Sequence, residues 1–235
     1  MLTEVTLGTR ARCFAVLSLA LLLLLASESF AAPITVPTTL PPGAQYRLAF
    51  VTFGGHTATS TNIADYDAFV QAEANTEPAL GPIPWQVIGT TETPLARDHT
   101  GTAPGNYPGV PIFRLDDVKL VDNYADLWDW SIDAPLSVDQ HGVTLGATAV
   151  WTGTGSTGQA TSPHQLGSPY GVGTGILNAT DYSWTRFGYS VATAVPRRMY
   201  ALSEVLVVPV PEPSPRPLLA LGVAAFLLSR RVLRD

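Results

Sequence analysis

Met199-Tyr200-Ala201-Leu202-Ser203-Glu204-Val205-Leu206-Val207-Val208 is the most strand-like run in this 235-residue chain, and it ends in four aliphatic residues. Tyr46-Arg47-Leu48-Ala49-Phe50-Val51 is a second apolar run of strand length, near the other boundary of the region available for folding. Two strands at opposite boundaries can pair with each other and bring the ends of a domain together. The loops between them would then project from the opposite side.

Helical spacing of apolar residues predicts a helix from Ile63 to Ala74, with Thr61 or Asn62 as its N-cap. A shorter helix is expected after Asn123, which can also cap. No internal repeat is visible.

The remaining strands are predicted to be short and separated by long loops. Asp116-Asp117 reads as the turn of a small hairpin, and the sequence after Thr152 is Gly-rich through Gly175. The expected strand positions are residues 85–88, 112–115, 119–121 and 149–152. The pattern indicates an α+β fold in a single domain, over residues 44–208.

Composition restricts the possible partners. Hydrophobic residues make up 46% of the chain and charged residues 14%, which is typical of a folded protein. The net charge is −6, although six of the twelve arginines lie in the terminal segments, so the body is more acidic still. We therefore expect no nucleic-acid partner, because phosphate backbones are held by basic patches.

The N-terminal segment has the three regions of a secretory signal. Arg10 and Arg12 precede an apolar run of about 13 residues, which as a helix would cover ~20 Å of the ~30 Å hydrocarbon core. Ser29-Phe30-Ala31 then supplies small residues for cleavage after Ala31. Residues 1–31 are thus expected to be removed by signal peptidase, and residues 32–43 to form a stiff Pro-rich lead-in.

The only cysteine, Cys13, lies within this signal. The mature chain would contain no thiol, which excludes a disulfide framework, a thiolate zinc site and a cysteine nucleophile.

The C-terminal segment combines three features in a fixed order. A Pro-rich spacer at residues 209–217 contains Pro211-Glu212-Pro213, and an apolar stretch and several arginines follow within residues 218–235. Prolines keep such a spacer extended, and arginines favour the cytoplasmic side of a membrane. The alternative is a plain membrane anchor behind a Pro-rich linker.

This order resembles the PEP-CTERM sorting signal of exopolysaccharide-producing Gram-negative bacteria. The resemblance implies that Pro211, Glu212 and Pro213 form the motif recognised by an exosortase. It also implies transient anchoring in the inner membrane through the apolar helix, with the protein finally at the cell surface or outside the cell. Arg216 and the shortness of the apolar stretch depart from the pattern.

Several segments of the body, in their order, resemble the endostatin-like branch of the C-type-lectin-like fold. They are residues 47–51, 111–117, 123–129, 134–136, 150–153 and 200–204. The resemblance implies a single domain with paired terminal strands, short helices and long loops. The disulfides common in that fold are absent, as are the Glu-Pro-Asn, Gln-Pro-Asp and Trp-Asn-Asp triplets of calcium-dependent sugar binding.

Aspartates are concentrated between residues 116 and 139. Calcium takes six to eight oxygen ligands, so Asp116, Asp117, Asp122 and Asp126 are candidate ligands, although their spacing does not fit an EF-hand. The alternative is that they form turns and place charges at helix ends. No other cofactor is expected.

Two exposed aromatic residues, Trp130 and Tyr170, are candidates for stacking against a ligand, while Trp151 reads as core. The histidines at positions 56, 99, 141 and 164 fall in expected loops and show no metal-binding spacing.

The sequence favours an exported, non-catalytic surface or matrix module that binds polysaccharide or another envelope component. The alternative is a secreted carbohydrate-active hydrolase using two carboxylates, for instance among Asp116, Asp126 and Asp139.

Overall fold

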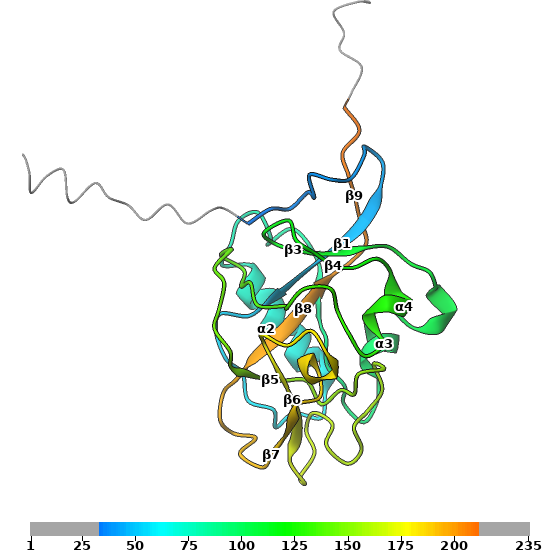
Figure 1. Cartoon of the computed structure of the whole chain (residues 1–235). Coiled ribbons are helices and arrows are strands. Elements are labelled where there is room, and N and C mark those ends of the chain that lie inside the picture. Colours follow the sequence, from blue (N-terminus) through cyan, green and yellow to red (C-terminus); the bar gives the residue numbers. More distant parts are fainter. Residues whose placement is uncertain (1–32, 212–235) are drawn as a thin grey trace, which may run out of the picture.

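The computed structural model describes residues 33–211, which form a mixed sheet with a few short helices and long loops (Figure 1). The expected α+β class is confirmed at this level. The strands are β1 (Gln45–Val51), β2 (Trp85–Val87), β3 (Ile112–Arg114), β4 (Lys119–Val121), β5 (Ala149–Trp151), β6 (Val172–Ile176), β7 (Gly188–Ser190), β8 (Arg198–Ser203) and β9 (Leu206–Val207). The helices are α2 (Ile63–Ala74), α3 (Ala96–His99), η1 (Pro104–Asn106), α4 (Tyr124–Leu127) and η2 (Tyr182–Trp184).

The sheet runs in the order β4-β3-β1-β8-β5-β6-β7, with β2 paired to β8 and β9 paired to β1. The central pair is β1 with β8, in antiparallel orientation, as expected for strands at the two boundaries of the domain. In Figure 1, β9 leaves the sheet at the top and β7 lies at the bottom.

A β-bulge divides the C-terminal run into two strands. Ala49 pairs with Leu202, whereas Tyr46 pairs with Leu206, so three residues of the later run oppose two of β1. The Ser203 hydroxyl accepts a hydrogen bond from the Leu48 N–H at 2.9 Å, and the Ser203 carbonyl accepts one from the Arg47 side chain. The continuous strand expected over residues 199–208 is therefore wrong, because β8 and β9 are separated by this bulge.

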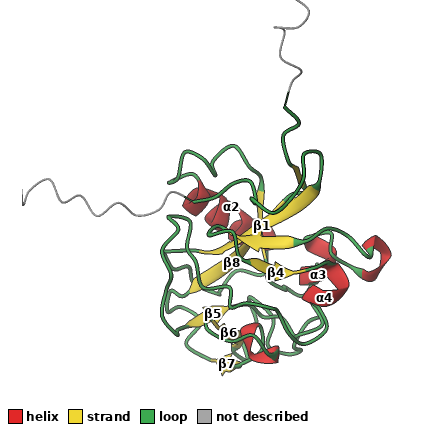
Figure 2. Cartoon of the chain, turned by 45° about the horizontal axis from the view of Figure 1, so that its top comes forward, coloured by secondary structure: helices red, strands yellow, loops and turns green. Residues whose placement is uncertain are grey.

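The sheet carries an apolar cluster on each face. Along β1, Leu48 and Phe50 belong to one cluster, while Ala49 and Val51 belong to the other, since side chains alternate between the faces of a strand. Helix α2 covers the first face through residues such as Val70, and α4 and η2 cover the second. Both layers are visible in Figure 2.

Asparagine caps set the starts of two helices. The Asn62 side chain accepts a hydrogen bond from the Ala64 N–H at 3.2 Å, and α2 spans the predicted residues 63–74. The Asn123 side chain accepts hydrogen bonds from the Ala125 and Asp126 N–H groups at the start of α4. The Ile112–Val121 hairpin also forms where it was predicted.

Strand β6 lies at the end of the stretch that is Gly-rich through Gly175, where no strand was predicted. A β-carbon on Gly175 would lie 2.7 Å from the carbonyl carbon of Trp184 and closer still to its oxygen. A β-carbon on Gly173 would lie 3.4 Å from the Cα of Gly153. Glycine therefore occupies this strand because neighbouring backbone approaches it closely.

The lead-in packs against the body of the domain. The Ile34 N–H donates to the Leu115 carbonyl at 2.7 Å, and Thr38 bonds to the Asp117 carboxylate. Val36 and Leu40 contact the first apolar cluster. Residues 33–43 thus add to the core in front of β1.

Candidate functional site

Two adjoining hollows lie beside β7: Gly188 and Tyr189 of that strand line the first, and the second shares lining residues with it. Strand β7 lies at the end of the molecule opposite β9 (Figure 1). The first, here called the aromatic hollow, has a volume of about 440 Å³ and includes Tyr182, Phe187 and Tyr189 in its lining. The second, here called the hydroxyl hollow, has a volume of about 360 Å³. Thr161 and Arg186 line both, so the two form one continuous surface.

The aromatic hollow presents large side chains to solvent. Tyr182, Phe187 and Tyr189 are 51%, 62% and 62% exposed. Three exposed aromatic residues within eight positions form a concentrated apolar patch, which in a folded domain indicates a contact surface. The phenol groups of Tyr182 and Tyr189 also supply polar edges.

Trp184 fixes the base of this hollow. Its indole is fully buried between the Trp128 and Tyr200 rings, with ring-centroid distances of 5.9 and 5.8 Å. The Phe187 N–H donates to the Thr174 carbonyl at 2.6 Å, which joins the segment to β6. The exposed aromatics therefore stand on a rigid base, anchored by one buried tryptophan.

A histidine orients Tyr189. The His164 and Tyr189 rings stack with centroids 4.2 Å apart and planes 10° from parallel. His164 Nδ1 lies 3.2 Å from the Gly171 carbonyl oxygen, which can only accept, so Nδ1 carries the proton. The stack holds one face of Tyr189 and leaves it 62% exposed.

The hydroxyl hollow is formed by a tight Gly-rich turn. The Gly155 N–H donates to the Gln159 carbonyl at 2.7 Å, and the Gly158 N–H donates back to the Gly155 carbonyl. Gly158 has a φ of 72°, and a β-carbon there would lie 2.9 Å from the Trp128 ring. The turn thus packs on the core, and its Ser and Thr residues line the hollow, with Ser162 exposed, Thr157 partly exposed, and Ser156 and the Thr161 hydroxyl buried.

Trp130 projects at the edge of the hydroxyl hollow. It is 55% exposed and has a φ of 87°, a left-handed conformation that costs energy for any residue with a β-carbon. Backbone strain at an exposed aromatic residue that lines a hollow makes Trp130 a candidate functional residue. The exposure predicted for Trp130 is confirmed.

Tyr170, the other residue expected to stack on a ligand, is 68% exposed but lines neither hollow. Tyr182, Arg186, Phe187 and Tyr189 were not singled out as site residues from the sequence. Their alternation with small and polar residues between 181 and 190 is the one signal that the sequence contained.

The four aspartates considered for calcium are engaged separately. Asp116 forms a two-point ion pair with Arg114, and Asp117 accepts hydrogen bonds from Thr38. Asp122 pairs with Lys119, and Asp126 accepts a hydrogen bond from the Asp122 N–H at 2.7 Å. Within residues 33–211 no group of three or more His, Cys, Asp or Glu side chains is arranged to hold a metal ion.

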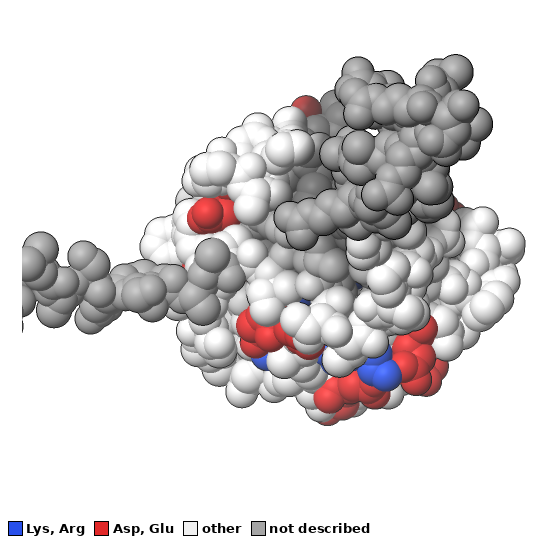
Figure 3. Space-filling model, turned by 90° about the horizontal axis from the view of Figure 1, so that it is seen from above, with Lys and Arg blue, Asp and Glu red and all other residues white. Residues whose placement is uncertain are grey.

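Lys119 is the centre of this acidic edge. The hydrogen bond that Lys119 donates to the Asp122 carboxylate raises the pKa of Lys119, and the negative charges of Asp122, Asp133 and Asp126 raise it further. Figure 3, a view onto the end of the molecule where β9 leaves, shows acidic groups gathered around basic atoms at one edge. This edge is distinct from the hollows beside β7.

The carboxylates considered for hydrolysis do not line the hollows. Asp139 is 1% exposed, and one of its oxygens accepts from the His141 and Val143 N–H groups at 2.9 Å. These two hydrogen bonds form the side-chain-to-backbone turn that is expected of an aspartate in a loop.

The expectation that all histidines lie in loops is wrong for His99, the last residue of α3, whose Nε2 lies 2.9 Å from the Asp67 carboxylate. The cause is an unrecognised helical turn at residues 96–99.

The sorting motif lies at the limit of the described residues. Pro211 is exposed, while Glu212 and Pro213 lie outside the described residues, as do the expected signal and the C-terminal apolar segment. No helix between residues 33 and 211 is long and apolar enough to cross a membrane.

Comparison with models of known protein families gives no match, and a search of curated proteins finds no significant match either.

Proposed function

We propose that this protein is an exported, non-catalytic surface or matrix module that binds polysaccharide through the two hollows beside β7. The observation that carries the proposal is the combination of Trp130, Tyr182, Phe187 and Tyr189, all at least half exposed, with threonine, serine and glutamine side chains around the same surface.

Sugar rings have apolar C–H faces and hydroxyl edges. Aromatic side chains cover the faces, while Ser, Thr and Gln side chains exchange hydrogen bonds with the hydroxyls. A ligand site of a few hundred Å³ accommodates one or two sugar units, and two adjoining hollows suit a chain of them. Because the buried Trp184 anchors the segment that carries Tyr182 and Phe187, less conformational entropy would be lost on binding.

The finer assignment of fold belongs to the same proposal. A C-type-lectin-like domain, in its endostatin-like form, is supported by the paired terminal strands, the early helix α2 on one face of the sheet and the long loops. Binding without calcium is supported by the separate engagement of the four aspartates.

The route to the surface rests on the terminal sequences. Signal peptidase would cleave after Ala31, and an exosortase would recognise Pro211-Glu212-Pro213 while the C-terminal helix anchors the chain in the inner membrane. The protein would then lie at the cell envelope or outside the cell. Exopolysaccharide is the partner expected there, with an envelope protein as the alternative.

A glycan array tests the proposal. The purified chain is compared with Trp130→Ala, Tyr189→Ala and a matched control, Tyr170→Ala, which removes an equally exposed aromatic residue outside both hollows. We expect at least a tenfold loss of affinity for the first two variants and none for the control. Because the three side chains are exposed, their replacement by alanine should change the free energy of unfolding by no more than about 0.5 kcal/mol. Thermal melting of each variant checks this.

Two results would contradict the proposal: retention of polysaccharide binding by both hollow variants, or specific turnover of a polysaccharide by the purified chain. Envelope pull-downs with the same variants distinguish a protein partner from a glycan.

A further inference from the structure

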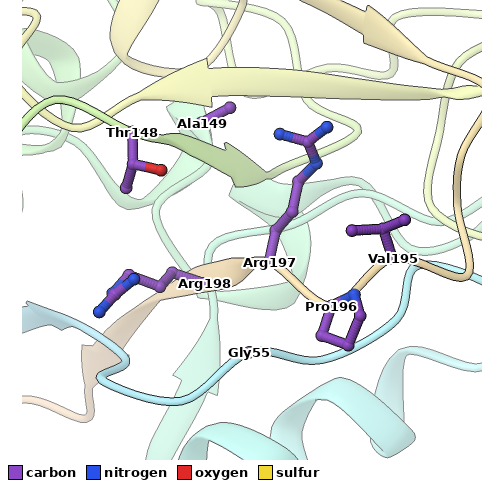
Figure 4. Close-up of a pocket in the computed structure, with 7 residues that line it drawn as sticks. All are labelled: Gly55, Thr148, Ala149, Val195, Pro196, Arg197 and Arg198. Carbon is purple, nitrogen blue, oxygen red and sulfur yellow. The ribbon is translucent and has the colours of Figure 1, made fainter.

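A third hollow contains two adjacent arginines. It has a volume of about 330 Å³ and lies where β5 and β8 begin (Figure 4). Thr148 and Ala149 line it at the start of β5, Gly55 from the loop after β1, and Val195 to Arg198 from the segment that enters β8. We call it the arginine hollow.

The backbone and two aromatic rings hold these arginines in place. Arg197 and His56 exchange both backbone hydrogen bonds, at 2.9 and 3.0 Å. The Arg197 guanidinium carbon lies 4.8 Å from the Trp151 ring centroid, and that of Arg198 lies 5.6 Å from the Phe53 ring centroid. Stacking of this kind fixes the guanidinium planes before any ligand arrives.

Neither guanidinium has an anionic partner among residues 33–211. The Nε atoms of Arg197 and Arg198 are buried and make no hydrogen bond, and no carboxylate of the described chain forms an ion pair with either. Arg47 and Arg114, in contrast, donate to carbonyls or a carboxylate within the protein. Because both Nε atoms are shielded from solvent, the donors that the hollow offers to a ligand are the terminal Nη groups, which have no ion-pair partner among the described residues.

The charge of the chain is divided along its length. Residues 33–139 carry thirteen Asp and Glu against four Lys and Arg, whereas residues 140–203 carry one acidic residue, Asp181, against Arg186, Arg197 and Arg198. The second part forms β5 to β8 and most of all three hollows. An anionic ligand would be repelled by the first part of the chain and attracted by the second.

The two guanidiniums are positioned for separate anions. Arg197 and Arg198 are neighbours on extended backbone, where successive side chains take opposite directions. In Figure 4 the Arg197 guanidinium lies on the side of Ala149, while that of Arg198 extends away from it on the side of Thr148. Two diverging cations match a polymer with repeated anionic groups better than a single small anion.

We infer that the polysaccharide of the proposed function is acidic, with carboxylates of its sugar units bound by Arg197 and Arg198 and a further one by Arg186. The planar guanidinium fork matches the two oxygens of a carboxylate. This inference rests on the proposed function, since it names the chemical class of the same ligand.

Binding of two polymers to the purified full chain tests it: polygalacturonate, which carries a carboxylate on each unit, and dextran, which is neutral. We expect tighter binding of polygalacturonate, weakening as salt is raised because the charges are screened. Arg197→Gln combined with Arg198→Gln should lower the affinity for polygalacturonate at least tenfold and leave that for dextran unchanged. Arg198→Lys, which keeps the charge but not the fork, should lie between.

The outcomes separate the two claims. If both polymers bind with equal affinity and Trp130→Ala still weakens that binding, the ligand is not specifically acidic, but the proposed function stands. If the chain binds neither polymer and no glycan on the array, both the acidic ligand and the proposed function are overturned. Tighter binding of single-stranded DNA than of polygalacturonate would refute a carbohydrate ligand for these arginines. If the double Gln variant does not fold, the salt dependence of the wild-type chain and the Arg198→Lys variant decide the question.

Discussion

Replacement of Gly175 by alanine should separate β6 from the segment that supports the aromatic hollow. The added β-carbon would lie 2.7 Å from the carbonyl carbon of Trp184. Ordinary contact between two carbon atoms is about 3.5–4.0 Å, so the overlap is about 1 Å. Both partners are fixed to the backbone, so no change of rotamer relieves the clash.

The cost follows from the elements that must move. Overpacking of a tight interior costs about 1–3 kcal/mol or more, and a shift of β6 would also weaken the pairing of Gly175 with Val150. We expect Gly175→Ala to lower the free energy of unfolding by about 3 kcal/mol. For a domain of this size that corresponds to a melting temperature lower by roughly 6–12 °C.

Urea denaturation of the wild type, Gly175→Ala and a matched control, Gly188→Ala, measures the effect. Gly188 lies in the neighbouring strand β7. A β-carbon added there would lie 3.9 Å from the nearest atom, the Thr174 hydroxyl oxygen, which is an ordinary contact. If the two variants unfold within about 0.5 kcal/mol of each other, close packing is not the reason for glycine in β6.

Three further predictions concern other parts of the chain. Asn123→Ala removes the cap of α4 and should lower the free energy of unfolding by about 1 kcal/mol, measured by urea denaturation. An unchanged urea midpoint would contradict this prediction. Burial raises the pKa of Tyr200 above its ordinary value of 10.0, so its contribution to stability is complete below pH 10.0 and is lost as pH rises through the folded pKa. The free energy of unfolding, measured from pH 8 to 11, should therefore fall at the alkaline end, and it should fall less in Tyr200→Phe. At pH 8 this variant should be as stable as the wild type or more stable, because the buried hydroxyl that it removes has no hydrogen-bond partner. Pro211→Ala combined with Glu212→Ala should change the mass and cellular fraction of the mature protein; an unchanged pattern would leave only a plain anchor.

Calcium offers a simple negative test of the acidic edge. Because the candidate aspartates already bind groups of the protein, added Ca²⁺ should leave the melting temperature unchanged and release no heat in titration calorimetry. A clear rise in melting temperature would show that these side chains rearrange around the ion.

Elements that depend on neighbouring residues alone could be predicted from the sequence. The helix from Ile63 to Ala74 follows from apolar spacing and an asparagine cap, and the hairpin around Asp117 follows from turn chemistry. Pairing of the boundary strands was also predictable, because both runs are strongly apolar.

The parts that could not be predicted depend on contacts between distant segments. Gly175 lies in a strand because the Trp184 backbone passes beside it, and no pattern within residues 172–176 records that neighbour. The bulge at Ser203 depends on where β1 and β9 meet. For the candidate site, the exposure of Trp130 was predicted, but its proximity to Thr161 and Arg186 arises only on folding.

The position of β8 also determines how the domain would carry load. The strand runs from the arginine hollow towards β9, with β1 along one edge and β5 and β2 along the other. Tension between a ligand held in the hollows and an anchor beyond residue 211 would act along the strand (Figure 1). The hydrogen bonds to all three neighbours would then be sheared together and not broken one at a time. We therefore expect the tethered domain to resist extension until β8 slips as a whole.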